Sequence, residues 1–164
     1  MDKKILNLLN EQIGREFYSS HMYLQMAAWF EHQGLEGFAN WMVIQAKEEA
    51  EHAMKLYRFV NERGEFVELG EIPKPPKDFH SVLELFEEVK EHEKQISAHI
   101  HEIKKQSLEL SDFSSSCRLD WFIAEQVEEE ASVASIIAKL RLIEKDSSAL
   151  FLFDKELGNR VFTH

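Results

Sequence analysis

The sequence predicts an all-α fold: a four-helix bundle with one long crossover, followed by a short fifth helix at the C-terminus. Three observations indicate this class. Glycine and proline are scarce, with 6 and 3 among 164 residues, and all three prolines lie in one segment. Four long stretches repeat apolar residues at alternating spacings of three and four, which is the period of an amphipathic helix. Residues 1–164 are treated as a single domain, because this length is sufficient for one sizeable core.

The first two predicted helices cover residues 2–32 and 35–63 and are joined by a short turn at 32–37. Gly64 follows the second helix, in the position where a glycine commonly ends a helix. Segment 64–79 then holds all three prolines and two glycines. It is too long for a tight turn and too rich in proline for a helix, so we expect an extended crossover.

The third predicted helix runs from about residues 78–81 to about 108. Ser81 and Glu84 have the spacing of a capping box at its start. A short turn leads to the fourth helix, over residues 113–145. The two short turns make two antiparallel hairpins, and the crossover joins one hairpin to the other.

The fifth predicted helix covers residues 147–157 and contains the apolar run "ALFLF" at 149–153. Four helices already close the bundle, so this apolar surface needs another partner. It can fold back onto the end of its own bundle or pack against neighbouring subunits. The residues alone leave both arrangements open, and the second would make the protein a homo-oligomer.

Charge and cysteine content exclude several classes of function. The net charge is −11, which argues against nucleic acid as a partner. Cys117 is the single cysteine of the sequence, so it allows no intrachain disulfide and suggests a reducing compartment. The N-terminus has no apolar signal core, and no segment approaches the roughly 18–20 apolar residues of a membrane span. We expect a cytoplasmic protein that does not bind membranes.

Each of the four long helices carries a glutamate near its middle, on its apolar stripe. These are Glu16, Glu49, Glu93 and Glu129. No lysine or arginine lies on the same stripes, so the carboxylates have no cationic partner there. Buried unpaired charges are costly and repel one another, so the four must either hold protons or bind cations. His52 shares the stripe of Glu49 and favours cations, since neutral imidazole is a metal ligand.

Counted from the turns, at about 1.5 Å per residue, the four glutamates come within roughly one helical turn of a common height. Carboxylate oxygens with one imidazole suit iron or manganese, and zinc is possible. The set offers more ligands than one ion needs, which indicates two ions bridged by Glu49. Two adjacent ferrous ions can each give one electron to dioxygen, so an oxidase activity has a physical basis.

Four sequence motifs resemble the helix motifs of bacterial non-haem ferritins. They are "REFYSSHMYLQM" (15–26), "AKEEAEH" (46–52), "EHEKQI" (91–96) and "DWFIAEQVEEE" (120–130). The resemblance extends over essentially the whole chain. It implies a ferritin-like bundle that stores iron and acts as a ferroxidase, oxidising Fe(II) with dioxygen or peroxide. It also implies a cage of twenty-four subunits that holds ferric mineral.

The resemblance also assigns site residues. The first iron would use Glu16, Glu49 and His52. The second would use Glu49, Glu93 and Glu129, with Gln126 close by. A third iron site would use Glu48, Glu125, Glu128 and Glu129. Tyr23 matches a tyrosine that lies beside the diiron centre in the family.

Two departures from related families argue against haem. Haem-binding bacterioferritins carry a second Glu-x-x-His where this chain has Gln126 and Glu129, and a methionine where it has Ala50. Three other interpretations remain open from the sequence. They are a ferritin-like protein with another metal preference, a passive cation buffer, and a helical interaction bundle whose carboxylates are protonated. The remaining histidines, at 21, 32, 80, 92, 99, 101 and 164, are interpreted as surface or structural residues.

Overall fold

The computed structural model describes residues 1–143 and 146–162, and the described residues form five α-helices. They are α1 (Lys3–Gln33), α2 (Glu36–Glu62), α3 (Val82–Glu109), α4 (Phe113–Ile143) and α5 (Ser147–Leu157). The predicted all-α fold with a short C-terminal helix is confirmed, and the observed bounds lie close to the predicted ones. The last two residues predicted for the fourth helix, 144–145, lie outside the described residues.

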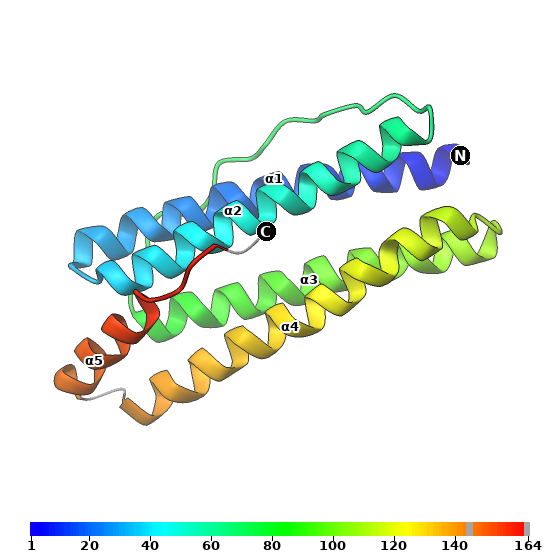
Figure 1. Cartoon of the computed structure of the whole chain (residues 1–164). Coiled ribbons are helices and arrows are strands. Elements are labelled where there is room, and N and C mark those ends of the chain that lie inside the picture. The colour runs from blue at the N-terminus through cyan, green and yellow to red at the C-terminus, as the bar shows by residue number, and fades with distance from the viewer. Residues whose placement is uncertain (144–145, 163–164) are drawn as a thin grey trace.

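The long helices pair as predicted, with α1 against α2 and α3 against α4, while α1 also packs on α3 (Figure 1). The segment between α2 and α3 contains no helix and runs from one end of the bundle to the other (Figure 1). Gly64 has a φ of 72°, so it ends the second helix in the left-handed conformation that glycine accepts without steric cost. Ser81 accepts a hydrogen bond from the Glu84 amide at 3.1 Å and caps α3. None of the described helices has the length and apolar character to cross a membrane.

Two separate hydrophobic clusters fill the bundle, one towards each end. The cluster near α5 is built from the C-terminal parts of α1 and α4, the N-terminal parts of α2 and α3, and α5 itself, and it includes Phe30, Phe38 and Phe86. The other cluster includes Ile5 and Leu56. Between the two clusters, the core contains the polar side chains described below. The apolar packing therefore stabilises the bundle from both sides of this polar layer.

Helix α5 folds back onto the end of its own bundle, where Phe153 and Leu157 are buried. Asp154 is only 3% exposed, and its Oδ1 accepts hydrogen bonds from the amides of Gly37 (2.9 Å) and Phe38 (3.0 Å). Helix α2 has no cap of its own, because Leu35 at its N-cap makes no side-chain hydrogen bond. Asp154 supplies this cap from a distant part of the chain.

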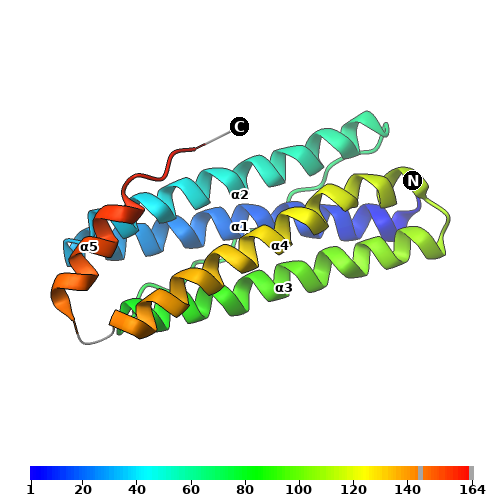
Figure 2. The same ribbon diagram turned by 60° about the horizontal axis from the view of Figure 1, so that its bottom comes forward.

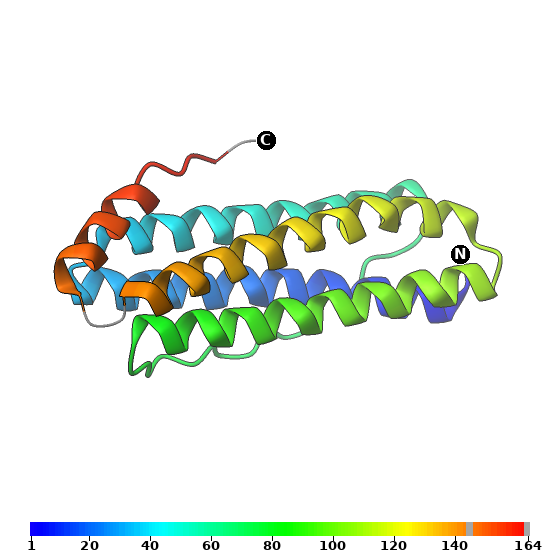
Figure 3. The same cartoon turned by 90° about the horizontal axis from the view of Figure 1, so that it is seen from below.

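The other side of α5 is exposed in the single chain. Phe151 and Leu152 are 58% and 68% exposed. One side of α5 thus packs against the end of its own bundle. The other side leaves apolar surface for a neighbouring subunit, which stays a prediction. After α5, the chain turns back and runs beside α2 (Figures 2 and 3).

Candidate metal centre

Helices α1 and α2 bring together three of the predicted ligands. Glu16, Glu49 and His52 each offer one ligand atom, and these atoms lie within 4.8 Å of one another. All three residues are at most 3% exposed. His52 Nδ1 is 3.5 Å from Glu49 Oε2, because residues three apart on a helix lie on the same face. This group has the composition and spacing of a metal site.

A second group forms between α2 and α4, where His52, Glu125 and Glu129 have ligand atoms within 4.8 Å of one another. Glu129 is buried and Glu125 is half-buried. The family resemblance assigns Glu125 and Glu129 to one ion and His52 to another. Glu128 is exposed and belongs to neither of the two groups found among the described residues. Its role as a ligand stays a prediction.

Two glutamines hold three of the glutamates in place. Gln12 Nε2 donates to Glu16 Oε1 at 2.7 Å. Gln45 Nε2 donates to Glu49 Oε1 at 3.2 Å and to Glu129 Oε2 at 2.6 Å, so one amide joins the two hairpins. Such hydrogen bonds fix the orientation of carboxylates around a metal. Neither Gln12 nor Gln45 is among the predicted site residues, although each stands four residues before a predicted ligand, on the same helical face.

Glu93 is held by two further donors. Gln126 Nε2 donates to Glu93 Oε2 at 3.1 Å, and the Tyr23 hydroxyl donates to Glu93 Oε1. Burial raises the pKa of Tyr23 well above its usual value, and the Glu93 carboxylate raises it further, which keeps the phenol protonated as the donor. Glu93 is buried in the same polar layer, but neither ligand group includes it. Gln126 and Tyr23 thus contact a predicted ligand directly.

The ionised form of the glutamates in this layer is energetically unfavourable. Burial raises the pKa of Glu16, of Glu49 and of Glu93 above the ordinary value. Burial, with the Glu93 carboxylate nearby, raises the pKa of Glu129 to about 7. Glu16 Oε2 is buried, and no described residue donates a hydrogen bond to it. A divalent cation would neutralise these charges and bind the unpaired oxygen, so the residues fit a metal.

His52 lies at the boundary between the buried layer and an outer cavity. Its ring packs edge-on against Trp121, with centroids 5.4 Å apart, and against Phe122. The cavity has a volume of about 550 Å³, and its lining includes Glu48, Glu125 and His52. Ions that reach this cavity therefore meet acidic side chains next to the inner ligands.

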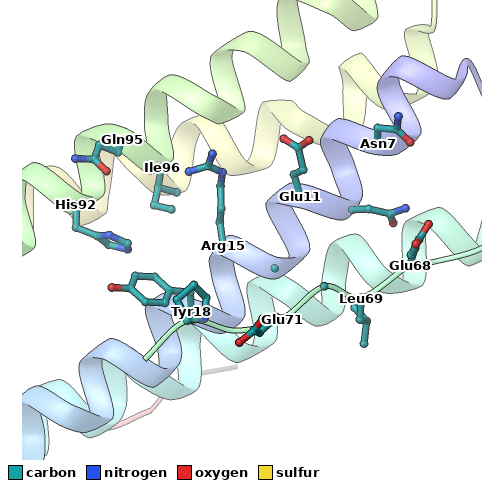
Figure 4. Close-up of a pocket in the computed structure, with 14 residues that line it drawn as sticks. Asn7, Glu11, Arg15, Tyr18, Glu68, Leu69, Glu71, His92, Gln95 and Ile96 are labelled. Atoms are coloured by element: carbon teal, nitrogen blue, oxygen red, sulfur yellow. The ribbon is translucent and has the colours of Figure 1, made fainter. Parts of the chain in front are cut away.

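A larger cavity, of about 720 Å³, lies between α1, α3 and the crossover. Arg15, Tyr18 and His92 line it (Figure 4), and none of its described lining residues is a predicted ligand. His92 Nε2 lies 2.7 Å from Ser19 Oγ, and burial, with Arg15 nearby, lowers the pKa of His92 to about 4. This neutral, hydrogen-bonded histidine fits the structural role predicted for it.

His99 was predicted only as a surface or structural residue, but its position is more specific. Its Nδ1 lies 2.6 Å from Gln12 Oε1, and Gln12 in turn donates to Glu16. Since the Gln12 carbonyl can only accept, His99 Nδ1 is the donor of this bond. His99 therefore fixes the Gln12 side-chain amide, and this amide in turn orients Glu16, a predicted ligand.

Fold and site together define a four-helix bundle whose core holds a carboxylate and histidine metal centre. The family model described as "Ferritin-like domain" matches residues 6–143. A probable bacterial non-heme ferritin-like protein of Haemophilus influenzae is 40% identical over 159 residues, covering 97% of this chain and 96% of its own. A bacterial non-heme ferritin of Staphylococcus aureus is 38% identical over 162 residues, covering 99% and 98%.

Solved structures agree with these matches. A ferritin of Archaeoglobus fulgidus engineered into a closed form superposes with a TM-score of 0.98 at 47% identity, covering 99% of both chains. The open-pore ferritin of the same archaeon gives a TM-score of 0.97 at 46% identity, covering 98% of this chain and 99% of the other. The chain belongs to the ferritin family. It is of the bacterial non-haem type, which stores iron and has a ferroxidase centre.

Proposed function

We propose that the ferroxidase centre is formed by the residues that the family resemblance assigns as iron ligands. One ferrous ion binds Glu16, Glu49 and His52, and a second binds Glu49, Glu93 and Glu129. Gln126 and Tyr23 hold Glu93 in position and are close enough to influence the second ion. The single observation that carries this proposal is Glu16, whose Oε2 is buried without a hydrogen-bond donor and whose carboxylate offers an atom within 4.8 Å of ligand atoms of Glu49 and His52.

The reaction oxidises Fe(II), which is the substrate, with dioxygen or peroxide as the oxidant. Two ferrous ions each lose one electron, and one dioxygen takes up both electrons and two protons to form hydrogen peroxide. The protein contributes by holding the two ions side by side and by supplying carboxylates that stabilise the higher charge of Fe(III). Gln12, Gln45 and Gln126 keep these carboxylates in a fixed geometry, so little reorganisation accompanies the electron transfer.

A third ion would bind in the outer cavity, with Glu48, Glu125 and Glu129 as its ligands and Glu128 nearby. Glu125 and Glu129 share a group with His52, which supports a cation beside the inner pair. An ion at this place could pass between the cavity and the inner centre. We propose this site as a transit position for iron.

We also propose a homo-oligomeric cage of twenty-four subunits that holds ferric mineral, in the cytoplasm and without haem. The exposed Phe151 and Leu152 of α5 support assembly, because apolar side chains of this size favour a partner surface. The single cysteine supports a reducing compartment. Residues 1–164 form one domain in this proposal.

Oxygen uptake tests the ferroxidase proposal. Fe(II) is added to the metal-free protein in an oxygen electrode, at two ions per subunit. We expect rapid consumption of about one dioxygen for every two ferrous ions, by the electron count given above. Binding of Fe(II) with uptake no faster than in buffer would instead indicate a passive cation buffer. No binding would indicate a helical bundle with protonated carboxylates.

A further inference from the structure

The chain segment after α5, residues 158–162, lies on α2 and is held there by its backbone and by Arg160. Asn40 Nδ2 donates to the Arg160 carbonyl at 3.0 Å. The Arg160 guanidinium lies over the Trp41 ring, 4.6 Å from its centroid, in a cation–π contact. The side chain of Arg160 is only 24% exposed. These contacts hold the positive charge of Arg160 against α2, beside Gln45 and Glu48.

The two terminal nitrogens of Arg160 reach two acceptors on one face of α2. Nη1 donates to Gln45 Oε1 at 2.9 Å, and Nη2 donates to Glu48 Oε2 at 2.5 Å. The bond to Glu48 is an ion pair between groups that are each less than one quarter exposed. Charge-assisted hydrogen bonds of this kind are about twice as strong as neutral ones.

Glu48 also faces the outer cavity, together with Glu125 and His52. The charge of Glu48 lies close enough to interact with the same two residues and with Glu129. It is therefore the carboxylate that could complete a third ion site around this group. Its Oε2, however, already binds a cation that belongs to the chain itself.

We propose that Arg160 competes with the third metal ion for the carboxylate of Glu48. The inference rests on the proposed third site. An ion that takes Glu48 as a ligand must either displace Nη2 of Arg160 from Oε2 or share the carboxylate with it through Oε1. In both cases the guanidinium opposes the binding of a second cation, so the outer site holds ions more weakly than its carboxylates alone would. Weak binding suits a position through which iron passes rather than one in which it stays. Arg160 is thus a residue that sets the affinity of the outer site without touching the inner ions.

The test measures binding of Zn²⁺, which is not oxidised, to the metal-free assembled protein by titration calorimetry. In Arg160→Ala, we expect the weakest class of sites to bind about tenfold more tightly, because a charge-assisted bond no longer competes. Arg160→Gln also lacks the charge but keeps a polar side chain, and it should show the same change if the alanine variant does not assemble. Arg118→Ala is the matched control, since Arg118 pairs with Glu62 on the exposed surface; it should bind as the parent does.

Glu48→Gln separates competition from a general effect of removing one positive charge. Without the Glu48 carboxylate there is nothing to compete for, so Arg160→Ala added to Glu48→Gln should change outer-site affinity little. An equal gain with and without Glu48 would overturn the inference in favour of a long-range field effect. Unchanged or weaker binding in Arg160→Ala, while Glu48→Gln weakens the outer site, would overturn the inference and leave the proposed third site intact. If Glu48→Gln binds Zn²⁺ as the parent does, the proposed third site and this inference both fail.

Discussion

Glu49→Gln is expected to slow the initial rate of aerobic Fe(II) oxidation by about 100-fold or more, to near the background rate. Glu49 shares one buried group of ligand atoms with Glu16 and His52, its Oε2 lies 3.5 Å from His52 Nδ1, and Gln45 donates a hydrogen bond to its Oε1. Loss of a mere supporting residue at a metal site typically costs about 10–100-fold in affinity or activity, so loss of a ligand shared by two ions costs at least as much. Stopped-flow absorbance of the ferric product measures this rate.

The same substitution is expected to stabilise the metal-free protein above neutral pH. Burial, with Glu93 and Glu129 nearby, raises the pKa of Glu49, so its charge opposes folding. Buried carboxyl groups with a raised pKa stay protonated to a higher pH in the folded protein than in the unfolded chain. For Glu129, with an ordinary pKa of 4.5 and a folded value of about 7, the stability contribution is present below 4.5 and lost as the pH rises through 7. Thermal unfolding without metal should therefore show a higher Tm for Glu49→Gln than for the parent at pH 8, and little difference at pH 4.5.

The control for both measurements is Glu87→Gln, which removes an exposed carboxylate that pairs with Arg141. Exposed ion pairs contribute little, so its oxidation rate and Tm should match those of the parent. Parent-like oxidation by Glu49→Gln would remove Glu49 from the centre. A metal-free Tm at pH 8 that is lower than the parent's would show that its buried charge does not oppose folding.

Gly37→Ala is expected to destabilise the fold by about 2–5 kcal/mol, from steric overlap and from the loss of two buried hydrogen bonds. A Cβ at residue 37 would lie 1.6 Å from the carbonyl oxygen of Asp154, which is backbone and cannot turn aside. Helix α5 would have to move, and Asp154 would lose its bonds to the start of α2. The gain in helix propensity from alanine, about 1 kcal/mol, is smaller than this loss. The free energy of unfolding in denaturant measures the difference.

Gly14→Ala is the matched control for this prediction, because Gly14 is also inside a helix but has no atom within 4 Å of the added Cβ. We expect it to be neutral or slightly stabilising. If both variants are equally stable, the contact between α5 and α2 does not contribute to stability. If α5 also packs against neighbouring subunits, Gly37→Ala should in addition shift the assembled protein to smaller species in sedimentation.

The helices and the burial of the predicted ligands could be predicted because both follow from local spacing. Glu49 and His52 interrupt an apolar stripe, and the spacing of three places them on one face whatever surrounds them. Gln12 and Gln45 could have been found in the same way, since each precedes a ligand by four residues. They were missed because a glutamine on a helix face has many ordinary explanations.

The contacts made by the C-terminal part of the chain could not have been predicted from spacing. Arg160 and Glu48 are 112 residues apart, and Asp154 and Gly37 are 117 apart. Nothing in the local sequence of either partner indicates the other, because the pairing depends on where α5 ends on the bundle surface. The second ligand group likewise depends on how α4 lies against α2, which helical periodicity does not determine.

We propose above all that the polar layer of the core binds iron. Anomalous scattering at the iron absorption edge, from a crystal soaked anaerobically in Fe(II), tests it most directly. We expect two ordered iron peaks on either side of Glu49, one beside Glu16 and His52 and one beside Glu93 and Glu129. A weaker peak is expected in the outer cavity. Iron found only on the outer surface, with no peak among these buried carboxylates, would contradict it.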